Sequence, residues 1–323
     1  FERFAMTDEE DLSFHSFASY SPFAPQRPQQ SASSSSTSTA AAAPAAAEPP
    51  TAAYPPGFSR IAQKQWKLLR QGLPDGMYVV AFPSRVDLLR AIIVGTHGTP
   101  YHDALFVFDL QLPPEFPQQP PAVNYISHGE RINPNLYENG KVCLSLLGTW
   151  TGKQSCELWN PKTSTVLQVL VSIQALVLCE QPYYNEAGYE KQQGSADGAF
   201  HARRYNEGAL LLSLKSMMNT LAMPSPPFQK LILAHFAAAR TRILARCRKL
   251  LTLKAAAQAT LEVSIGAGSS TAAAHAASES DAVKEANLHG VLNSMPSLGF
   301  LHSLSTSVLR LEAALDKAES ADS

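Results

Sequence analysis

The sequence has few cysteines, little charge of either sign and no long apolar run. Four cysteines in 323 residues are too few for a disulfide framework, and no two have the C-x-x-C spacing of a zinc ribbon. We therefore expect free thiols in a reducing compartment: the cytoplasm, the nucleus or the cytosolic face of endomembranes. No segment approaches the roughly 18 consecutive apolar residues that a transmembrane helix needs.

The charge balance of the whole chain gives no case for two classes of partner. Charged residues make up 16% of the chain and the net charge is −1, so the chain as a whole has no general attraction to nucleic acid or to anionic membrane surfaces. The sequence gives no reason to expect a metal or a cofactor. The chain opens on Phe1 rather than on Met, and we expect it to be a piece of a longer protein.

The two ends of the chain are poor in core-forming sequence. Residues 26–53 form a low-complexity run of Gln, Ser, Ala, Thr and Pro, which cannot bury enough apolar surface to offset its ordering entropy. With the acidic, aromatic segment before it, this run predicts a disordered tail over 1–57; a docking peptide at its start is the alternative. Residues 256–323 predict a second low-complexity tail with a short helix at 303–318.

Between the tails, residues 58–222 have the pattern of one α+β domain. Ser59 can cap a helix that ends near Gly72. Runs of aliphatic and aromatic residues then predict strands, and helices follow an irregular segment. The expected strands are 77–82, 88–94, 105–112 and 123–126, and the expected helices are 164–178 and 199–221. This order predicts helices packed on a four-stranded antiparallel meander.

Residues 223–255 predict an appended amphipathic helix with a basic face. Leu231, Ile232 and Phe236 recur at helical spacing, and arginines fall between the apolar positions. We expect the apolar face to pack on the domain and the basic face to be solvated. A helix that binds a membrane surface or a partner is the alternative.

Cys143 is the candidate nucleophile. A single cysteine is more often a small buried apolar residue, but Asn139-Gly140 is a strong turn signal, so Cys143 should emerge from a tight turn. Eight residues upstream, Asn135 follows a rigid proline. A side-chain amide held near a thioester can stabilise the oxyanion that forms at its carbonyl. These residues together predict acyl transfer on sulfur.

No base lies within local sequence reach of Cys143. A cysteine protease needs such a partner to activate its thiol. A thiol that exchanges with another thioester does not need one, because the leaving group is itself a thiolate. The pattern therefore favours a protein that carries an acyl group over one that hydrolyses it.

Five short motifs surround Cys143. In chain order they are Thr99-Pro100-Tyr101, Phe116 to Pro121, Asn133 to Tyr137, Asn139 to Leu144 and Trp159-Asn160-Pro161. In order and spacing, over about half of the chain, they resemble the ubiquitin-conjugating enzyme family. The runs at 141–150, 167–174 and 182–189 resemble more closely the large hybrid conjugating/ligase enzymes and their plant relatives in phosphate homeostasis.

This resemblance implies the ubiquitin-conjugating fold and a mechanism. Cys143 would accept ubiquitin from the activating enzyme as a thioester, and a substrate lysine would then attack it, while Asn135 steadies the oxyanion or the loop. The activating enzyme would bind the first helix through Lys64, Lys67 and Arg70; an ordinary solvated face is the alternative. The implied partners are ubiquitin, the activating enzyme and protein substrates, and the need for a separate ligase is left open.

Three positions depart from the family pattern. The usual His-Pro-Asn reads Asn-Pro-Asn at 133–135, and we expect Asn133 to hydrogen-bond the loop backbone in place of the histidine. The loop that in the family usually carries a Phe for docking ligases has Gln118 at that place. The family's Trp-Ser-Pro-Ala reads Trp159-Asn160-Pro161-Lys162 here. These two changes place a polar or charged side chain where a ligase expects an apolar anchor, which favours direct substrate recognition.

The incoming lysine has no obvious acidic partner in the sequence. Alignment with the family places that acid at Tyr184 or Asn185, with Glu186 next along. Tyr184 could orient the amine and Glu186 could supply charge, whereas packing of Tyr183 and Tyr184 at a helix end is the alternative. Cys156, in a short insertion near the nucleophile, is expected to be an incidental cysteine.

Two classes of function remain open at the level of sequence. The first is an active conjugating enzyme, with transfer of another ubiquitin-like modifier as its variant. The second is a catalytically silent ubiquitin-binding scaffold that keeps the fold. Inactive forms of this fold lack the cysteine, so the presence of Cys143 with Asn135 at the expected spacing favours the enzyme.

Overall fold

The structure is a computed structural model that describes residues 1–19, 54–150, 157–253, 258 and 296–322. The linker expected at 26–53, Cys156 and most of the low-complexity C-terminal sequence therefore lie outside the described residues. Within these ranges, no helix is both long and apolar enough to span a bilayer.

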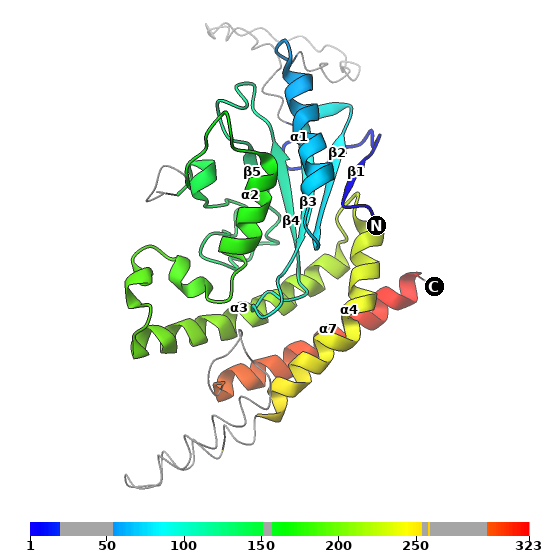
Figure 1. Cartoon of the computed structure of the whole chain (residues 1–323). Coiled ribbons are helices and arrows are strands. Elements are labelled where there is room, and N and C mark those ends of the chain that lie inside the picture. The colour runs from blue at the N-terminus through cyan, green and yellow to red at the C-terminus, as the bar shows by residue number, and fades with distance from the viewer. Residues whose placement is uncertain (20–53, 151–156, 254–257, 259–295, 323) are drawn as a thin grey trace, which may run out of the picture.

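A five-stranded sheet forms the centre of the domain (Figure 1). In spatial order its strands are β1 (Phe4–Met6), β2 (Met77–Phe82), β3 (Arg85–Val94), β4 (Leu105–Gln111) and β5 (Ala122–Tyr125). Strands β2 to β5 form the predicted antiparallel meander, and β1 adds a parallel fifth strand beside β2. Phe106 and Phe108, two positions apart on β4, are fully buried, which is the spacing that places one strand face in a core.

Helices α1 (Phe58–Gly72) and α2 (Val166–Ser172) contact each other, and α1 also contacts β3. A capping box starts α2: the Thr165 hydroxyl accepts from the Gln168 N–H at 3.2 Å, and the Gln168 side chain accepts from the Thr165 N–H at 2.9 Å. A π-helical turn, Ile173–Val177, continues it, so the helix predicted at 164–178 is confirmed, but only one of its faces is buried, because Val171 and Leu176 are exposed. The cap predicted at Ser59 is wrong, because α1 already includes that residue.

Three C-terminal helices pack together below the sheet in Figure 1. They are α3 (Ala196–Ala222), α4 (Gln229–Thr252) and α7 (Leu298–Asp322), and α7 contacts both of the others. Leu301, Leu304 and Leu311 of α7 are fully buried. The short helix expected at 303–318 is therefore corrected to a helix of 25 residues. Its apolar residues pack on α3 and α4, a contact that the local sequence does not reveal.

The predicted basic helix, α4, packs its apolar face on the domain as expected. Its arginines are paired rather than simply solvated. Arg242 and Arg246 both reach the buried carboxylate of Asp103, at 2.9 and 3.1 Å. Two further arginines pair with acidic residues of α7, as Arg240–Asp316 and Arg248–Glu312. These contacts use both faces of α4 within the fold, which disfavours the membrane-surface alternative.

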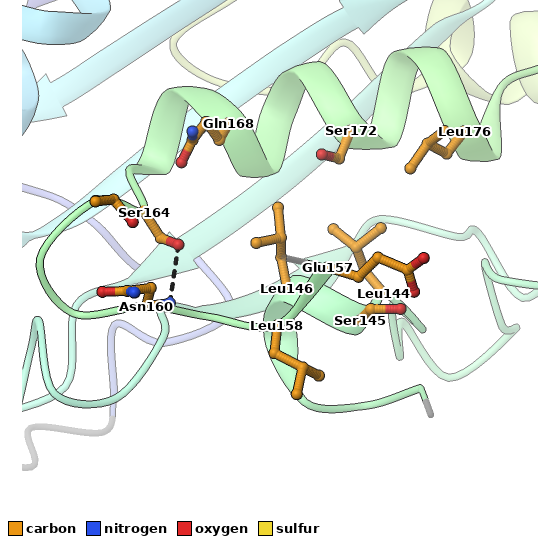
Figure 2. A pocket seen from close by; sticks show the side chains of 11 residues that line it. Leu144, Ser145, Leu146, Glu157, Leu158, Asn160, Ser164, Gln168, Ser172 and Leu176 are labelled. Atoms are coloured by element: carbon orange, nitrogen blue, oxygen red, sulfur yellow. Dashed lines mark hydrogen bonds between the residues drawn. The ribbon is translucent and has the colours of Figure 1, made fainter. Parts of the chain in front are cut away.

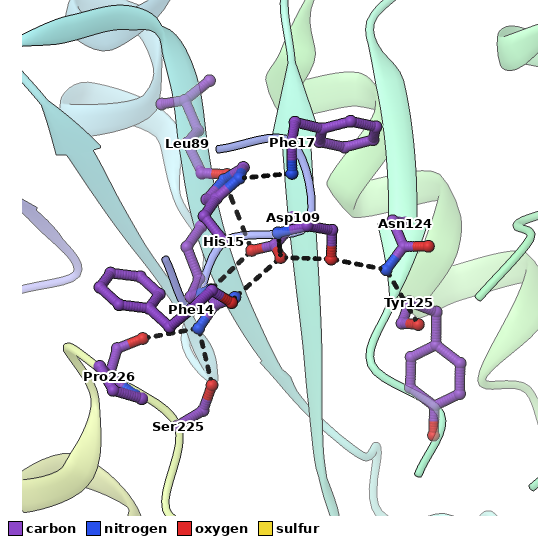
Figure 3. Close-up of polar contacts among 11 residues, drawn as sticks. Phe14, His15, Phe17, Leu89, Asp109, Asn124, Tyr125, Ser225 and Pro226 are labelled. Atoms are coloured by element: carbon purple, nitrogen blue, oxygen red, sulfur yellow. Dashed lines mark hydrogen bonds and ion pairs between the residues drawn. The ribbon is translucent and has the colours of Figure 1, made fainter. Parts of the chain in front are cut away.

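The first 19 residues correct the boundary of the tail predicted at 1–57. After β1 the chain crosses the sheet, and His15 is buried there with its ring against the carbonyl oxygen of Leu89, at 3.0 Å. The backbone N–H and the hydroxyl of Ser16 both donate to Asp109, each at 2.7 Å (Figure 3).

The partner of that carboxylate is Arg90, on the neighbouring strand β3. Its guanidinium donates to Asp109 and also to the backbone oxygens of Phe14 and Pro226. This acidic, aromatic segment is thus ordered because it satisfies buried charges of the sheet and packs Phe14 and Phe17 against the core.

Candidate active site

Asn133 fixes the loop that leads to the nucleophile. It is fully buried, and its Nδ2 donates to the Tyr101 hydroxyl at 2.8 Å and to the Val177 carbonyl oxygen at 2.7 Å. Its Oδ1 accepts from the backbone N–H of Asn135 at 2.8 Å, so the hydrogen bond expected in place of the family histidine is present. Burial raises the pKa of Tyr101 well above its usual range, and the neutral phenol donates to Ile132.

Asn135 holds the backbone of Cys143 from both sides. The Cys143 N–H donates to the Asn135 carbonyl oxygen, and the Asn135 Nδ2 donates to the Cys143 carbonyl oxygen, both at 2.9 Å. The Oδ1 of Asn135 is buried and has no hydrogen-bond partner among the described residues. Of the two roles considered for this amide, the geometry favours support of the loop, because its donor is directed at the main chain.

The turn predicted at Asn139-Gly140 forms a small hairpin before the nucleophile. The Tyr137 N–H donates to the Lys141 carbonyl oxygen at 3.0 Å, and the Lys141 N–H donates to the Asn139 side chain at 3.1 Å. Gly140 has φ +86, and a Cβ there would lie 2.2 Å from Oδ1 of Asn124. Only glycine fits both the left-handed conformation and this close approach.

Gly140→Ala should therefore lower the free energy of unfolding by about 2–4 kcal/mol, from the strained φ and the overpacking combined. Gly129→Ala is the matched control, since Gly129 also has a positive φ of +81 but nothing within 4 Å of a Cβ. It should cost about 1 kcal/mol. Urea denaturation of both variants measures the difference, and equal costs would contradict the close approach.

Cys143 lies in the wall of a cavity of about 620 Å³. The residue is only 2% exposed, so access to its sulfur is through this cavity. Asn135, Tyr184, Asn185 and Glu186 line the same cavity. The structure thus brings together the nucleophile, its loop amide and the three residues singled out for lysine positioning. None of the described lining residues is a histidine.

The three residues singled out for lysine positioning differ in how they are held. The Asn185 Nδ2 donates to the Leu176 carbonyl oxygen at 2.8 Å, which ties its loop to the end of the helix. Glu186 forms an ion pair with Arg131 at 3.1 Å, and the ring of Tyr184 packs edge-on against the preceding tyrosine. Their roles toward a lysine stay predictions. Arg131 carries no signal in the sequence, because its partner is 55 residues away.

A second cavity, of about 920 Å³, adjoins the first along α2 (Figure 2). Leu144, Ser145 and Leu176 line both cavities. The remaining lining residues are Leu146, residues of the segment at 157–164, and residues on the outward face of α2. Leu158 and Leu176 are 45% and 61% exposed, so a groove in which leucines alternate with polar side chains runs along this helix from beside the nucleophile.

The other residues singled out from the sequence lie away from the cavity. Lys64, Lys67 and Arg70 are exposed on α1, and the Arg70 guanidinium lies 5.2 Å from the ring centroid of Phe4. Gln118 and Lys162 are exposed on two loops. These loops are in contact. The Trp159 indole N–H donates to the Pro117 carbonyl oxygen at 2.7 Å, and the Trp159 ring packs at a tilt against the ring of Phe116.

The central part of the chain is similar to known proteins. The family model described as "Ubiquitin-conjugating enzyme" matches residues 61–204. The chain is 53% identical over 190 residues to "Probable ubiquitin-conjugating enzyme E2 23" of Arabidopsis thaliana, covering 59% of this chain and 17% of that protein. It is 50% identical over 190 residues to "Probable ubiquitin-conjugating enzyme E2 25" of the same plant, covering 59% and 31%.

A human protein is also similar. The chain is 41% identical over 179 residues to "Dual E2 ubiquitin-conjugating enzyme/E3 ubiquitin-protein ligase BIRC6" of Homo sapiens, covering 54% of this chain and 4% of that protein. The chain therefore spans less than a third of the length of each of these relatives.

Proposed function

We propose that the chain carries ubiquitin as a thioester on Cys143 and passes it to lysines of protein substrates, because residues 61–204 match the family model of ubiquitin-conjugating enzymes. The observation that supports this most is the position of Cys143. Its backbone is held on both sides by Asn135, and its side chain forms part of a cavity wall. A rigid loop that presents one thiol suits a carrier whose two partners must both reach the same sulfur.

The chemistry of loading needs little from the protein beyond this placement. The Cys143 thiolate attacks the thioester carbonyl carbon of the ubiquitin-loaded activating enzyme, a new C–S bond forms, and the activating enzyme's thiolate leaves. One thioester replaces another, so no water is activated and no base is needed to drive the step. The absence of histidine among the described lining residues agrees with this proposal.

The groove beside the nucleophile supports a bound acyl group of protein size. It begins at the residues that follow Cys143 and follows α2 past Ser172 to Gln168 (Figure 2). Exposed leucines among polar side chains, as at Leu158 and Leu176, suit a surface on which another protein packs. We assign it to ubiquitin held on Cys143, and we assign Lys64 and Lys67 of α1 to contact with the activating enzyme.

The finer proposal is a hybrid conjugating/ligase role. It is supported by the polar residues Gln118 and Lys162 on the two contacting loops, where a conventional ligase would need an apolar anchor. The human relative named as a dual enzyme carries the corresponding domain. The three described cysteines, Cys143, Cys179 and Cys247, are free, which agrees with the proposed cytoplasmic or nuclear setting.

A non-reducing gel tests the proposal. The protein is mixed with activating enzyme, ATP and ubiquitin, and an adduct that dithiothreitol removes should appear only when all components are present. Cys179→Ser is the matched control and should load normally, because Cys179 takes no part in the reaction. Ubiquitin that binds without forming any adduct would favour the silent scaffold, and an adduct with a different modifier alone would replace ubiquitin in the proposal.

A further inference from the structure

Tyr137 neighbours the nucleophile and has no part in the reaction proposed so far. Its backbone is held in the hairpin by Lys141, and its ring lies under the guanidinium of Arg131. Burial and then the neighbouring Cys143 raise the pKa of Tyr137, so the phenol stays protonated at neutral pH. It can therefore donate to a sulfur that carries negative charge.

Arg131 connects the ring of Tyr137 to Glu186, which lines the cavity. Its guanidinium lies over the ring of Tyr137, 4.4 Å from the centroid. One of its nitrogens donates to the Pro134 carbonyl oxygen at 3.2 Å and to Glu186 at 3.1 Å. A planar guanidinium can stack and hydrogen-bond at the same time. One side chain therefore contacts both the ring of Tyr137 and the carboxylate of Glu186.

Glu186 is placed to meet a cation. It lines the cavity that contains Cys143, and the Arg131 and Glu186 side chains are 42% and 37% exposed. Ion pairs exposed to this degree are weak and exchangeable, because water screens them. A lysine ammonium that enters the cavity can therefore replace the guanidinium on the carboxylate at little cost.

We propose that Arg131 is a positioning residue for the acceptor lysine: it holds Tyr137 beside Cys143 and keeps the Glu186 carboxylate at the cavity rim until the lysine exchanges onto it. This inference rests on the proposed transfer of ubiquitin from Cys143. The acceptor lysine then approaches from the Glu186 side of the cavity. Arg131 acts through two contacts, one with the ring of Tyr137 and one with the carboxylate of Glu186.

The transfer step balances without any further group. The ammonium loses one proton to water beside Glu186, and the resulting amine attacks the thioester carbonyl carbon. The C–N bond forms, the C–S bond breaks, and Cys143 leaves as a thiolate that accepts a hydrogen bond from Tyr137. The nitrogen then loses its second proton to water, which leaves a neutral amide.

Discharge of the preformed thioester to two small nucleophiles tests this assignment. Free lysine arrives as an ammonium, whereas hydroxylamine is uncharged at neutral pH and needs no carboxylate. Glu186→Gln should slow discharge to lysine about tenfold, the effect of one lost positioning contact, and leave discharge to hydroxylamine unchanged. Arg131→Ala should slow lysine more than hydroxylamine, and Arg131→Lys should recover part of the lysine rate.

Loading of wild-type protein is measured first, so failure of the proposed function is seen before any variant is compared. Arg248→Ala is the matched control, because it removes an arginine ion pair on α4 outside the cavity, and both of its discharge rates should equal those of wild type. The pH dependence of lysine discharge should shift downward in Glu186→Gln, because a carboxylate beside the ammonium stabilises its charged form and its removal lowers the pKa of the lysine. Equal losses with both nucleophiles in Arg131→Ala and Glu186→Gln, or no loss with either, would overturn the inference.

Discussion

Asp109→Ala should lower the free energy of unfolding by about 3–5 kcal/mol, the usual cost of removing one partner from a buried ion pair. Arg90 is 1% exposed and would keep only neutral partners, among them the carbonyl oxygens of Phe14 and Pro226 (Figure 3). Ser16 would also lose the acceptor of two hydrogen bonds. The first 19 residues should then detach more readily than in wild type.

Urea denaturation followed by tryptophan fluorescence gives the free energy, and limited proteolysis reports on the N-terminal segment. The matched control is Arg248→Ala, which breaks an ion pair whose arginine is 58% exposed and should cost less than about 1 kcal/mol. A cost for Asp109→Ala as small as that of the control, with unchanged proteolysis before residue 20, would mean that the segment does not depend on this network.

Asn133→Ala should have the largest effect on activity among substitutions that leave Cys143 intact. It removes both donors to Tyr101 and Val177 and the acceptor for the Asn135 N–H, leaving buried polar groups unpaired at a cost of about 3 kcal/mol. Because Asn135 in turn holds Cys143, the thiol should be misplaced. Thioester formation should fall by about a hundredfold, as expected for a shift of about 1 Å at a reacting atom.

Asn133→His is the control for this prediction, since histidine is the residue that the family pattern usually has there. It can still hydrogen-bond the loop and should retain most of the loading rate. Single-turnover loading from the activating enzyme measures both variants, and circular dichroism verifies that they are folded. A folded Asn133→Ala protein that loads at the wild-type rate would show that this residue does not set the position of the thiol.

The meander and the reactive loop were predictable because their signals are local. Apolar residues two positions apart, such as Phe106 and Phe108, predict strands whatever lies elsewhere in the chain. Asn139-Gly140 predicts a turn from the conformations that these two residues tolerate. The predicted strands therefore agree with β2 to β5 to within a few residues.

The features that escaped prediction depend on partners far along the chain. β1 has only three residues and gains its order from β2, more than 70 positions later. The length of α7 follows from the surface that α3 and α4 offer. The contact of Arg131 with Glu186 needs two loops to meet across the cavity. No period or turn signal reports such contacts, because each depends on a surface that a distant part of the chain supplies.

Mapping the attachment site of ubiquitin tests the central claim most directly. Cys143→Ser should trap ubiquitin as an oxyester that resists dithiothreitol, since an alcohol replaces the thiol as acceptor. Tryptic digestion followed by mass spectrometry should find the Gly-Gly remnant of ubiquitin at position 143. A remnant found only at other positions, or an adduct with wild-type protein that Cys143→Ser leaves equally sensitive to dithiothreitol, would contradict the account.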